Sequence, residues 1–153
     1  MDFLTTELLP WVQEHYHVTV DPARTVVAGS SYGGLAAAFA GLRRPDVFGN
    51  ILSQSGSFWW KPESESDWEW ITRQFDQSPR LPLRAHLDIG LFETEAVPGG
   101  PSQLESNRHL RDVLLSKGYS LHYTEFCGGH DTICWQGTLA NGLLALIPAG
   151  DEN

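Results

Sequence analysis

The sequence predicts an α/β fold with a parallel sheet, and three observations support this prediction. Short apolar and β-branched runs alternate with longer helical patterns along the whole chain. The run at 24–29 has no polar alternation, which is typical of a parallel strand buried on both faces. A glycine-rich turn then joins this run to an alanine-rich helix. The length of 153 residues and a hydrophobic content of 41% predict a single domain over 1–153.

The first half of the chain starts with a helix. We expect it from Asp2, as N-cap, to Tyr16, because apolar residues recur there with helical spacing. Pro10 either kinks this helix or marks its true start. The strand at 24–28 and a helix at 35–42 follow, and Pro45 ends that helix.

The second half repeats the alternation. We expect strands at 48–53, 84–90 and 120–126, and helices at 61–77, 103–117 and 132–147. The helix at 103–117 has apolar residues at helical spacing, and Gly118 suits the position just after its end. Residues 97–101, Val-Pro-Gly-Gly-Pro, form a loop by composition. Pro148 ends the last helix, and the tail at 150–153 is expected to fray.

Charge and composition exclude several classes of partner. The formal net charge of -9 argues against binding to nucleic acid or to an anionic membrane surface. No apolar run approaches the roughly 20 residues that span a bilayer, and the first ten residues lack the features of a secretory signal. Two cysteines, Cys127 and Cys134, do not make a disulfide framework. We therefore expect free thiols in a reducing compartment, the alternative being a disulfide that braces the loop between them.

Residues 29–33, Gly-Ser-Ser-Tyr-Gly, match the pattern G-x-S-x-G. The pattern alone is weak, but here it closes a predicted strand and opens a predicted helix. That context exposes the central serine on a sharp turn, as in the nucleophile elbow of α/β-hydrolases. We therefore predict that Ser31 is a catalytic nucleophile on an α/β-hydrolase fold. The alternative is a glycine-rich turn with a solvated serine.

The general base should be a histidine after the last strand, because the chain order in this fold is serine, acid, histidine. His130 meets this requirement, since it lies in the loop Gly128–Asp131 that follows the strand at 120–126. The other histidines lie in or beside predicted helices and strands: His15, His17, His86, His109 and His122. We therefore predict His130 as the base, the alternative being a loop histidine without a role.

The acid of the triad should follow the third strand. Asp88, Glu93 and Glu95 are candidates there, and Asp131 is a further one beside the histidine. Asp88 lies within the strand, and adjacent residues such as His130 and Asp131 rarely point at one another. We favour Glu93, three residues after the end of the strand, with a solvated loop carboxylate as the alternative.

An oxyanion hole needs two donors. One is the backbone N–H of Tyr32, the residue after the nucleophile. The other normally comes from a strand that would precede residue 1, so we expect either a fragment or a reduced hole. The fold is thus predicted to be reduced or truncated at its N-terminal side.

These blocks together resemble the enterochelin (ferric enterobactin) esterase family. Residues 24–35 are similar to its nucleophile block, residues 52–60 to its next strand and loop, and residues 128–131, followed by Cys134-Trp135, to its histidine block. Glu93 stands at the position of its acid. The family usually has glutamine where this chain has Ser30, and its N-terminal lid domain and first strands have no counterpart here.

The resemblance implies a Ser-His-Glu esterase that hydrolyses the trilactone of a catecholate siderophore in the cytoplasm, releasing iron. It implies a small-molecule ester substrate and neither a cofactor nor a catalytic metal. Trp59 and Trp60 are candidates for the substrate pocket, although bulky aromatics in small domains are mostly core. Trp135 is expected in the core. Two alternatives are a small-acyl carboxylesterase without a lid, and a non-catalytic fragment or binding module.

The strand at 24–28 is expected to become an edge of the sheet, because the strands that normally flank it would precede residue 1. An apolar strand is a poorly protected edge. We therefore expect a homodimer with two-fold symmetry that covers it. Such a partner would also bring a backbone N–H to Ser31 and supply the second oxyanion donor.

Overall fold

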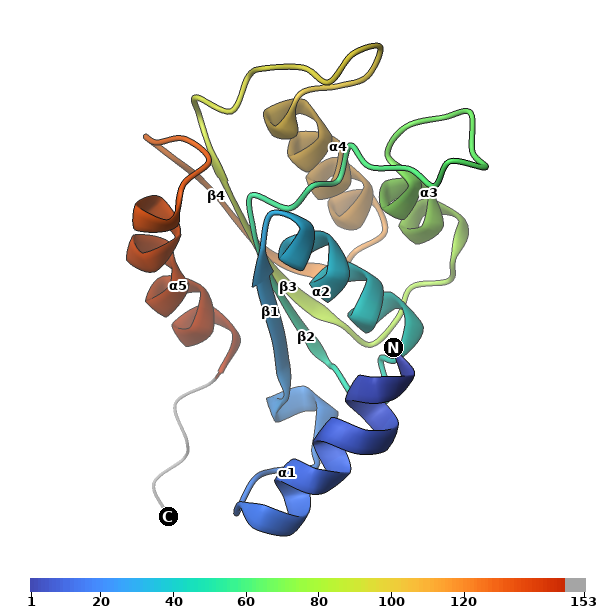
Figure 1. The fold of residues 1–153 in the computed structure, drawn as a ribbon, viewed down its shortest axis with the longest axis vertical. Coiled ribbons are helices and arrows are strands. Elements are labelled where there is room, and N and C mark those ends of the chain that lie inside the picture. The colour runs from blue at the N-terminus through green and yellow to red at the C-terminus, as the bar shows by residue number, and fades with distance from the viewer. Residues whose placement is uncertain (148–153) are drawn as a thin grey trace.

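The computed structural model describes residues 1–147 and contains a four-stranded sheet at its centre (Figure 1). The strands are β1 (Val26–Ser30), β2 (Asn50–Gln54), β3 (Arg84–Gly90) and β4 (Ser120–Phe126). They are arranged in the order β1-β2-β3-β4, and all three pairings are parallel. Parallel neighbours require crossover connections. The carboxyl ends of the strands therefore lie along one edge of the sheet, where the connecting loops begin.

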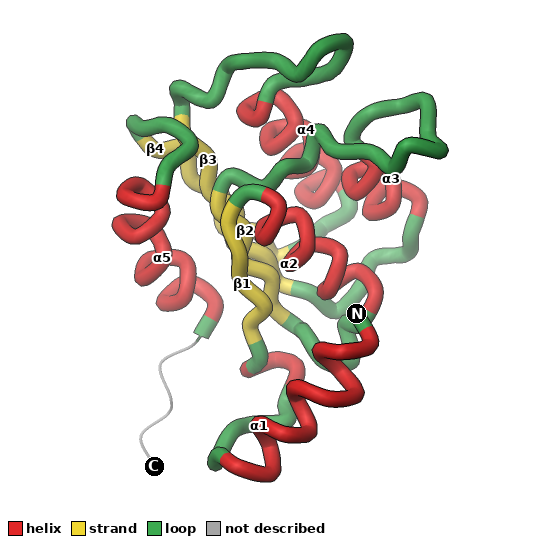
Figure 2. The backbone as a smooth tube through the Cα atoms, viewed as in Figure 1, coloured by secondary structure: helices red, strands yellow, loops and turns green. Residues whose placement is uncertain are grey.

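Helices cover both faces of the sheet (Figure 2). One face carries α2 (Tyr32–Arg43), α3 (Trp70–Gln77) and α4 (Gln103–Ser116), and the other carries α5 (Thr132–Leu146). α2 packs on β1 and β2, α4 on β3 and β4, and α5 mainly on β2 and β3. This three-layer α/β arrangement confirms the predicted fold class, a partial α/β-hydrolase fold.

The main hydrophobic core lies between the sheet and the layer of α2, α3 and α4. Its fully buried members come from every element of that layer and from the inner strands: Ala37, Ala38, Ile51, Phe58, Ile71, Phe75, Leu87 and Leu110. Burial of this apolar surface stabilises the packing of the helices on the sheet. The core thus holds the carboxyl edge of the strands, and the loops that leave it, in fixed positions.

The predicted first helix is present but divided. A π-helical stretch η1 (Phe3–Leu8) runs directly into α1 (Leu9–His15), and a 3₁₀ turn η2 (Pro22–Arg24) precedes β1. Pro10 lies in the first turn of α1. This confirms the prediction that Pro10 marks the start of an α-helix. Asp2 stands at the N-cap position, as predicted, but its side chain accepts no hydrogen bond from the helix. No residue of η1 or α1 is buried.

The helix predicted at 61–77 was wrong over its first half, because only α3 is helical there. Glu69 has a φ of 60°, in the left-handed region, which separates the preceding residues from the helix. The guanidinium of Arg73 instead donates to the carbonyl oxygens of Asp67 and Trp68 and to the carboxylate of Glu65. These contacts hold a loop where the sequence pattern indicated a longer helix.

The burial predicted for the first strand was wrong, whereas its position at an edge is confirmed. β1 is the terminal strand of the order, and its residues are half-buried or, at Ala28, exposed. The physical reason is that α5 packs mainly on β2 and β3 and leaves that side of β1 uncovered.

Two further expectations concern the rest of the chain. Cys127 and Cys134 are free thiols, as expected. Over the described residues, no helix has the combination of length and apolar character that crossing a membrane requires. The expectations for Pro148 and for 150–153 lie outside the described residues.

Candidate active site

Ser31 lies on a sharp turn between β1 and α2. Its backbone has φ 57° and ψ -122°, a conformation that L-residues adopt rarely and that clusters at functional sites. The turn is tight because Gly29 and Gly33 are in contact. A Cβ atom on Gly29 would lie 2.3 Å from the carbonyl oxygen of Gly33. Gly29 is therefore required by the close approach of strand and helix, whereas a Cβ atom on Gly33 would meet nothing within 4 Å.

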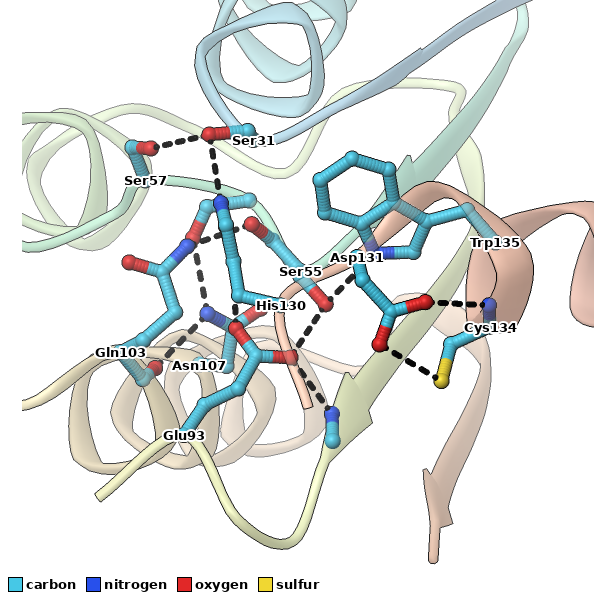
Figure 3. A network of polar contacts seen from close by, with 12 residues as sticks. Ser31, Ser55, Ser57, Glu93, Gln103, Asn107, His130, Asp131, Cys134 and Trp135 are labelled. Carbon is cyan, nitrogen blue, oxygen red and sulfur yellow. Dashed lines mark hydrogen bonds and ion pairs between the residues drawn. The ribbon is translucent and has the colours of Figure 1, made fainter. Parts of the chain in front are cut away.

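His130 lies in the loop between β4 and α5, close to Ser31 (Figure 3). Its Nε2 atom is 2.9 Å from the Oγ atom of Ser31. The two residues are 99 positions apart in the sequence, and the parallel sheet brings them together at its carboxyl edge. This distance is within reach for a direct proton transfer.

Glu93 lies in the loop that follows β3, and its side chain is 2% exposed. Its Oε2 atom is 2.6 Å from Nδ1 of His130. Its Oε1 atom accepts hydrogen bonds from the backbone N–H of Gly90, at 2.9 Å, and from the hydroxyl of Ser55, at 2.6 Å. The structure therefore aligns Ser31, His130 and Glu93 through two short contacts.

The other acidic candidates contact neither nitrogen of His130 in the described structure. Asp131 is the N-cap of α5, where its carboxylate accepts from the backbone N–H of Cys134, at 2.9 Å, and from its thiol. These two hydrogen bonds lower the pKa of Asp131. Asp88 is fully buried within β3, with 3.8 Å between its carboxylate and Nε2 of His86. Glu95 is exposed.

Tyr32 is the first residue of α2, and its side chain is exposed. The first N–H groups of a helix have no intrahelical acceptor, and the helix dipole favours negative charge there. The backbone N–H of Tyr32 is thus available at the point where an oxyanion would develop on an acyl group carried by Ser31.

The sequence reasoning missed two serines that lie beside Ser31 and Glu93. Ser55 and Ser57 are buried in the loop after β2. The hydroxyl of Ser57 is 3.4 Å from that of Ser31, and the hydroxyl of Ser55 contacts Glu93. The available signal was the placement of Ser-Gly-Ser after a strand next to the nucleophile strand, at the same sheet edge.

Trp135 was expected in the core, but this was wrong. It is half-buried on the first turns of α5, with its ring edge-on to that of His130 at a centroid distance of 4.8 Å. Its indole N–H donates to the hydroxyl of Ser55 at 3.0 Å. The residue is therefore held over the site by a polar contact as well as by packing.

The two tryptophans predicted to bind substrate have different surroundings. Trp60 lines an apolar cavity of about 400 Å³, together with Tyr32, Leu35, Ala36, Phe39, Pro62 and Trp70. Trp59 donates its indole N–H to Gln103 and packs edge-on against Tyr32. Trp60 therefore lines the cavity directly, whereas Trp59 contacts Tyr32, which lines it, and is not itself a lining residue.

A second cavity, of about 260 Å³, opens on the acid side of the site. It is lined by Phe92, Glu93, Glu95, Gln103 and His130. No lysine or arginine lines either of these two cavities. Among residues 1–147, no group of three or more His, Cys, Asp or Glu side chains is arranged to hold a metal ion.

Comparison with known proteins places this geometry in a family context. The family described as "Putative esterase" matches residues 1–146. The iron(III) enterobactin esterase of Dickeya dadantii is 38% identical over 161 aligned positions, covering 95% of this chain and 34% of that protein. The iron(III) enterobactin esterase of Escherichia coli K12 is 37% identical, covering 92% of this chain and 34% of its own length. The chain therefore spans about a third of the length of these curated relatives.

Solved structures agree. The enterobactin esterase of Shigella flexneri, crystallised in the presence of enterobactin, superposes with a TM-score of 0.79 at 36% identity. The match covers 94% of this chain and 35% of that one. A ferulic acid esterase superposes with a TM-score of 0.77 at 19% identity, which shows a shared fold alone.

Proposed function

Because this chain belongs to the esterase family that matches residues 1–146, we propose that it is a serine esterase acting on carboxylic esters. Ser31 is the nucleophile, His130 the general base and Glu93 the acid of the triad. The observation that carries this proposal is the continuous alignment of the three side chains, with contacts of 2.9 Å and 2.6 Å.

The geometry supports acyl transfer through a covalent intermediate. His130 takes the proton of the Ser31 hydroxyl as its oxygen attacks the ester carbonyl. The backbone N–H of Tyr32 stabilises the resulting oxyanion. His130 then protonates the departing alcohol, leaving an acyl-enzyme. Water, activated by the same histidine, hydrolyses the acyl-enzyme and regenerates Ser31.

We propose a catecholate siderophore ester, such as an enterobactin-like trilactone, as the substrate. Relatives named as iron(III) enterobactin and iron(III) salmochelin esterases support this choice. The aromatic cavity bordered by Trp60 suits a planar aromatic group, and Trp59 supports its wall through Tyr32. Iron would arrive as part of the substrate. Cytoplasmic location stays a prediction.

Two arms of one assay test the proposal. Purified protein is expected to hydrolyse both an enterobactin-like trilactone and a p-nitrophenyl short-chain ester, with the larger kcat/KM for the trilactone. The reverse order would favour a small-acyl carboxylesterase, for which the absence of charged side chains around the 400 Å³ cavity is the supporting observation. If neither ester is hydrolysed, the proposal is contradicted and the non-catalytic binding module is the alternative that remains.

The free edge of β1 supports a homodimer. α5 has no charged residue over its 15 positions, and Ile133 and Leu144 on it are nearly four-fifths exposed. An apolar helix beside a strand with one unpaired edge is the kind of surface that a second copy covers. Light scattering at micromolar concentration is expected to give twice the chain mass of 17.0 kDa. A monomer with full esterase activity would contradict both the pairing and a donor borrowed from the second copy.

A further inference from the structure

Ser55 occupies a constrained position that the reaction steps above do not use. It is fully buried at the end of β2, with a φ of 47° in the left-handed region. Its backbone N–H donates to the carbonyl oxygen of Asp88 at 2.7 Å. Such a conformation is costly for a serine and persists only when the surrounding structure enforces it. The constraint aims the hydroxyl at Glu93 and Trp135 (Figure 3).

The direction of each proton in this network follows from Trp135. An indole N–H is a donor only, so at 3.0 Å it occupies a lone pair of the Ser55 oxygen. The Ser55 hydroxyl, 2.6 Å from Oε1 of Glu93, therefore donates its own proton to the carboxylate. Since an ionised carboxylate is an acceptor only, the remaining oxygen of Glu93 accepts from Nδ1–H of His130.

The consequence reaches the nucleophile. With the proton on Nδ1, the Nε2 atom of His130 carries a lone pair, and that lone pair faces the Ser31 hydroxyl at 2.9 Å. This is the tautomer that a general base requires. The indole of Trp135 also packs against the ring of His130. One side chain thus contacts the base directly and the acid through Ser55.

We propose that Trp135 and Ser55 form a donor relay that holds the carboxylate of Glu93 oriented toward His130, which makes Ser55 a positioning residue for the triad. The inference rests on the proposed function. A buried carboxylate is costly unless donors compensate for the water it loses. Besides His130, Glu93 has two hydrogen-bond donors among the described residues, and Ser55 is the only side chain of the two.

Ser55→Ala is expected to lower kcat on the order of 10- to 100-fold, since hydrogen bonds to charged groups have effects of this size. KM should change less than about twofold, because Ser55 contacts no reacting atom.

Ser53→Ala is the matched control. Ser53 is a fully buried serine of β2, two residues before Ser55, and its hydroxyl has no hydrogen-bond partner among the described residues. Its removal is expected to leave kcat and KM unchanged. Trp135→Phe keeps the ring beside His130 and removes the N–H. It should lower kcat severalfold alone and add little to Ser55→Ala, because both act through one contact.

A spectroscopic arm separates this inference from the proposed function. The Nδ1–H proton of His130, bonded to a buried carboxylate, is expected as a far-downfield resonance in the proton NMR spectrum of the unmodified protein. It should shift or exchange faster in Ser55→Ala and stay in place in Ser53→Ala. If neither ester is hydrolysed but the resonance responds to the two substitutions as described, the proposed function is contradicted and the relay is supported. Equal kcat and an equal Nδ1–H resonance in Ser55→Ala and the unmodified protein would overturn the relay.

Discussion

Replacing Ser31 by alanine is expected to abolish ester turnover while leaving the protein folded. The hydroxyl is the atom that attacks the carbonyl, and no other side chain stands 2.9 Å from Nε2 of His130 in the described structure. Removing the nucleophile of a serine hydrolase typically costs about 10⁶-fold in rate. Hydrolysis of a p-nitrophenyl ester, with circular dichroism to verify folding, measures the effect.

Ser30→Ala is the internal control for this experiment. Its hydroxyl is next to the nucleophile in sequence but donates to the side chain of Gln54 at 3.2 Å. It contacts neither His130 nor Glu93, so turnover is expected to fall only mildly. More than a few per cent of activity remaining in Ser31→Ala would rule out Ser31 as the attacking residue.

The sheet could be predicted because its signal is local. The strands at 84–90 and 120–126 coincide with β3, which is buried along most of its length, and with β4, whose residues alternate between exposed and half-buried. The order of serine, acid and histidine then follows from the succession of strands. The sheet edge brings residues far apart in sequence to one place, which is why the sequence could nominate Ser31, Glu93 and His130 together.

Features that depend on tertiary contacts could not be predicted in the same way. The loop at 61–69 is stabilised by the carbonyl oxygens that surround Arg73, and no periodicity reports such contacts. The half-burial of β1 depends on where α5 packs. The position of Ser55 depends on a backbone conformation that its sequence, flanked by glutamine and glycine, does not indicate.

The choice between the acids shows the same limit. Glu93 and Asp131 are both close to His130 in the fold, and sequence spacing could only favour one. The structure separates them by their partners, because the carboxylate of Asp131 caps α5 whereas that of Glu93 contacts Nδ1 of His130. A substitution of each acid by its amide therefore tests the assignment directly.

Glu93→Gln is expected to lower kcat by about 10⁴-fold, the size of effect seen when a triad acid becomes an amide. Ser55 and Gly90 donate to the Oε1 position, so the amide oxygen must occupy it. The NH₂ group then faces Nδ1 of His130, which has to become an acceptor. The proton moves to Nε2, and the histidine can no longer take the proton of Ser31.

Asp131→Asn provides the comparison, because asparagine caps a helix about as well as aspartate does. Its amide oxygen can still accept from the backbone N–H of Cys134, as the carboxylate does at 2.9 Å. The tautomer of His130 is fixed by Glu93 in this variant, so kcat should stay within severalfold of the unmodified protein. Steady-state kinetics on one ester substrate measures both variants. If Asp131→Asn slowed turnover more than Glu93→Gln, the carboxylate that sets the tautomer of His130 would be Asp131, and Glu93 would serve only to join the loops after β3 and β4.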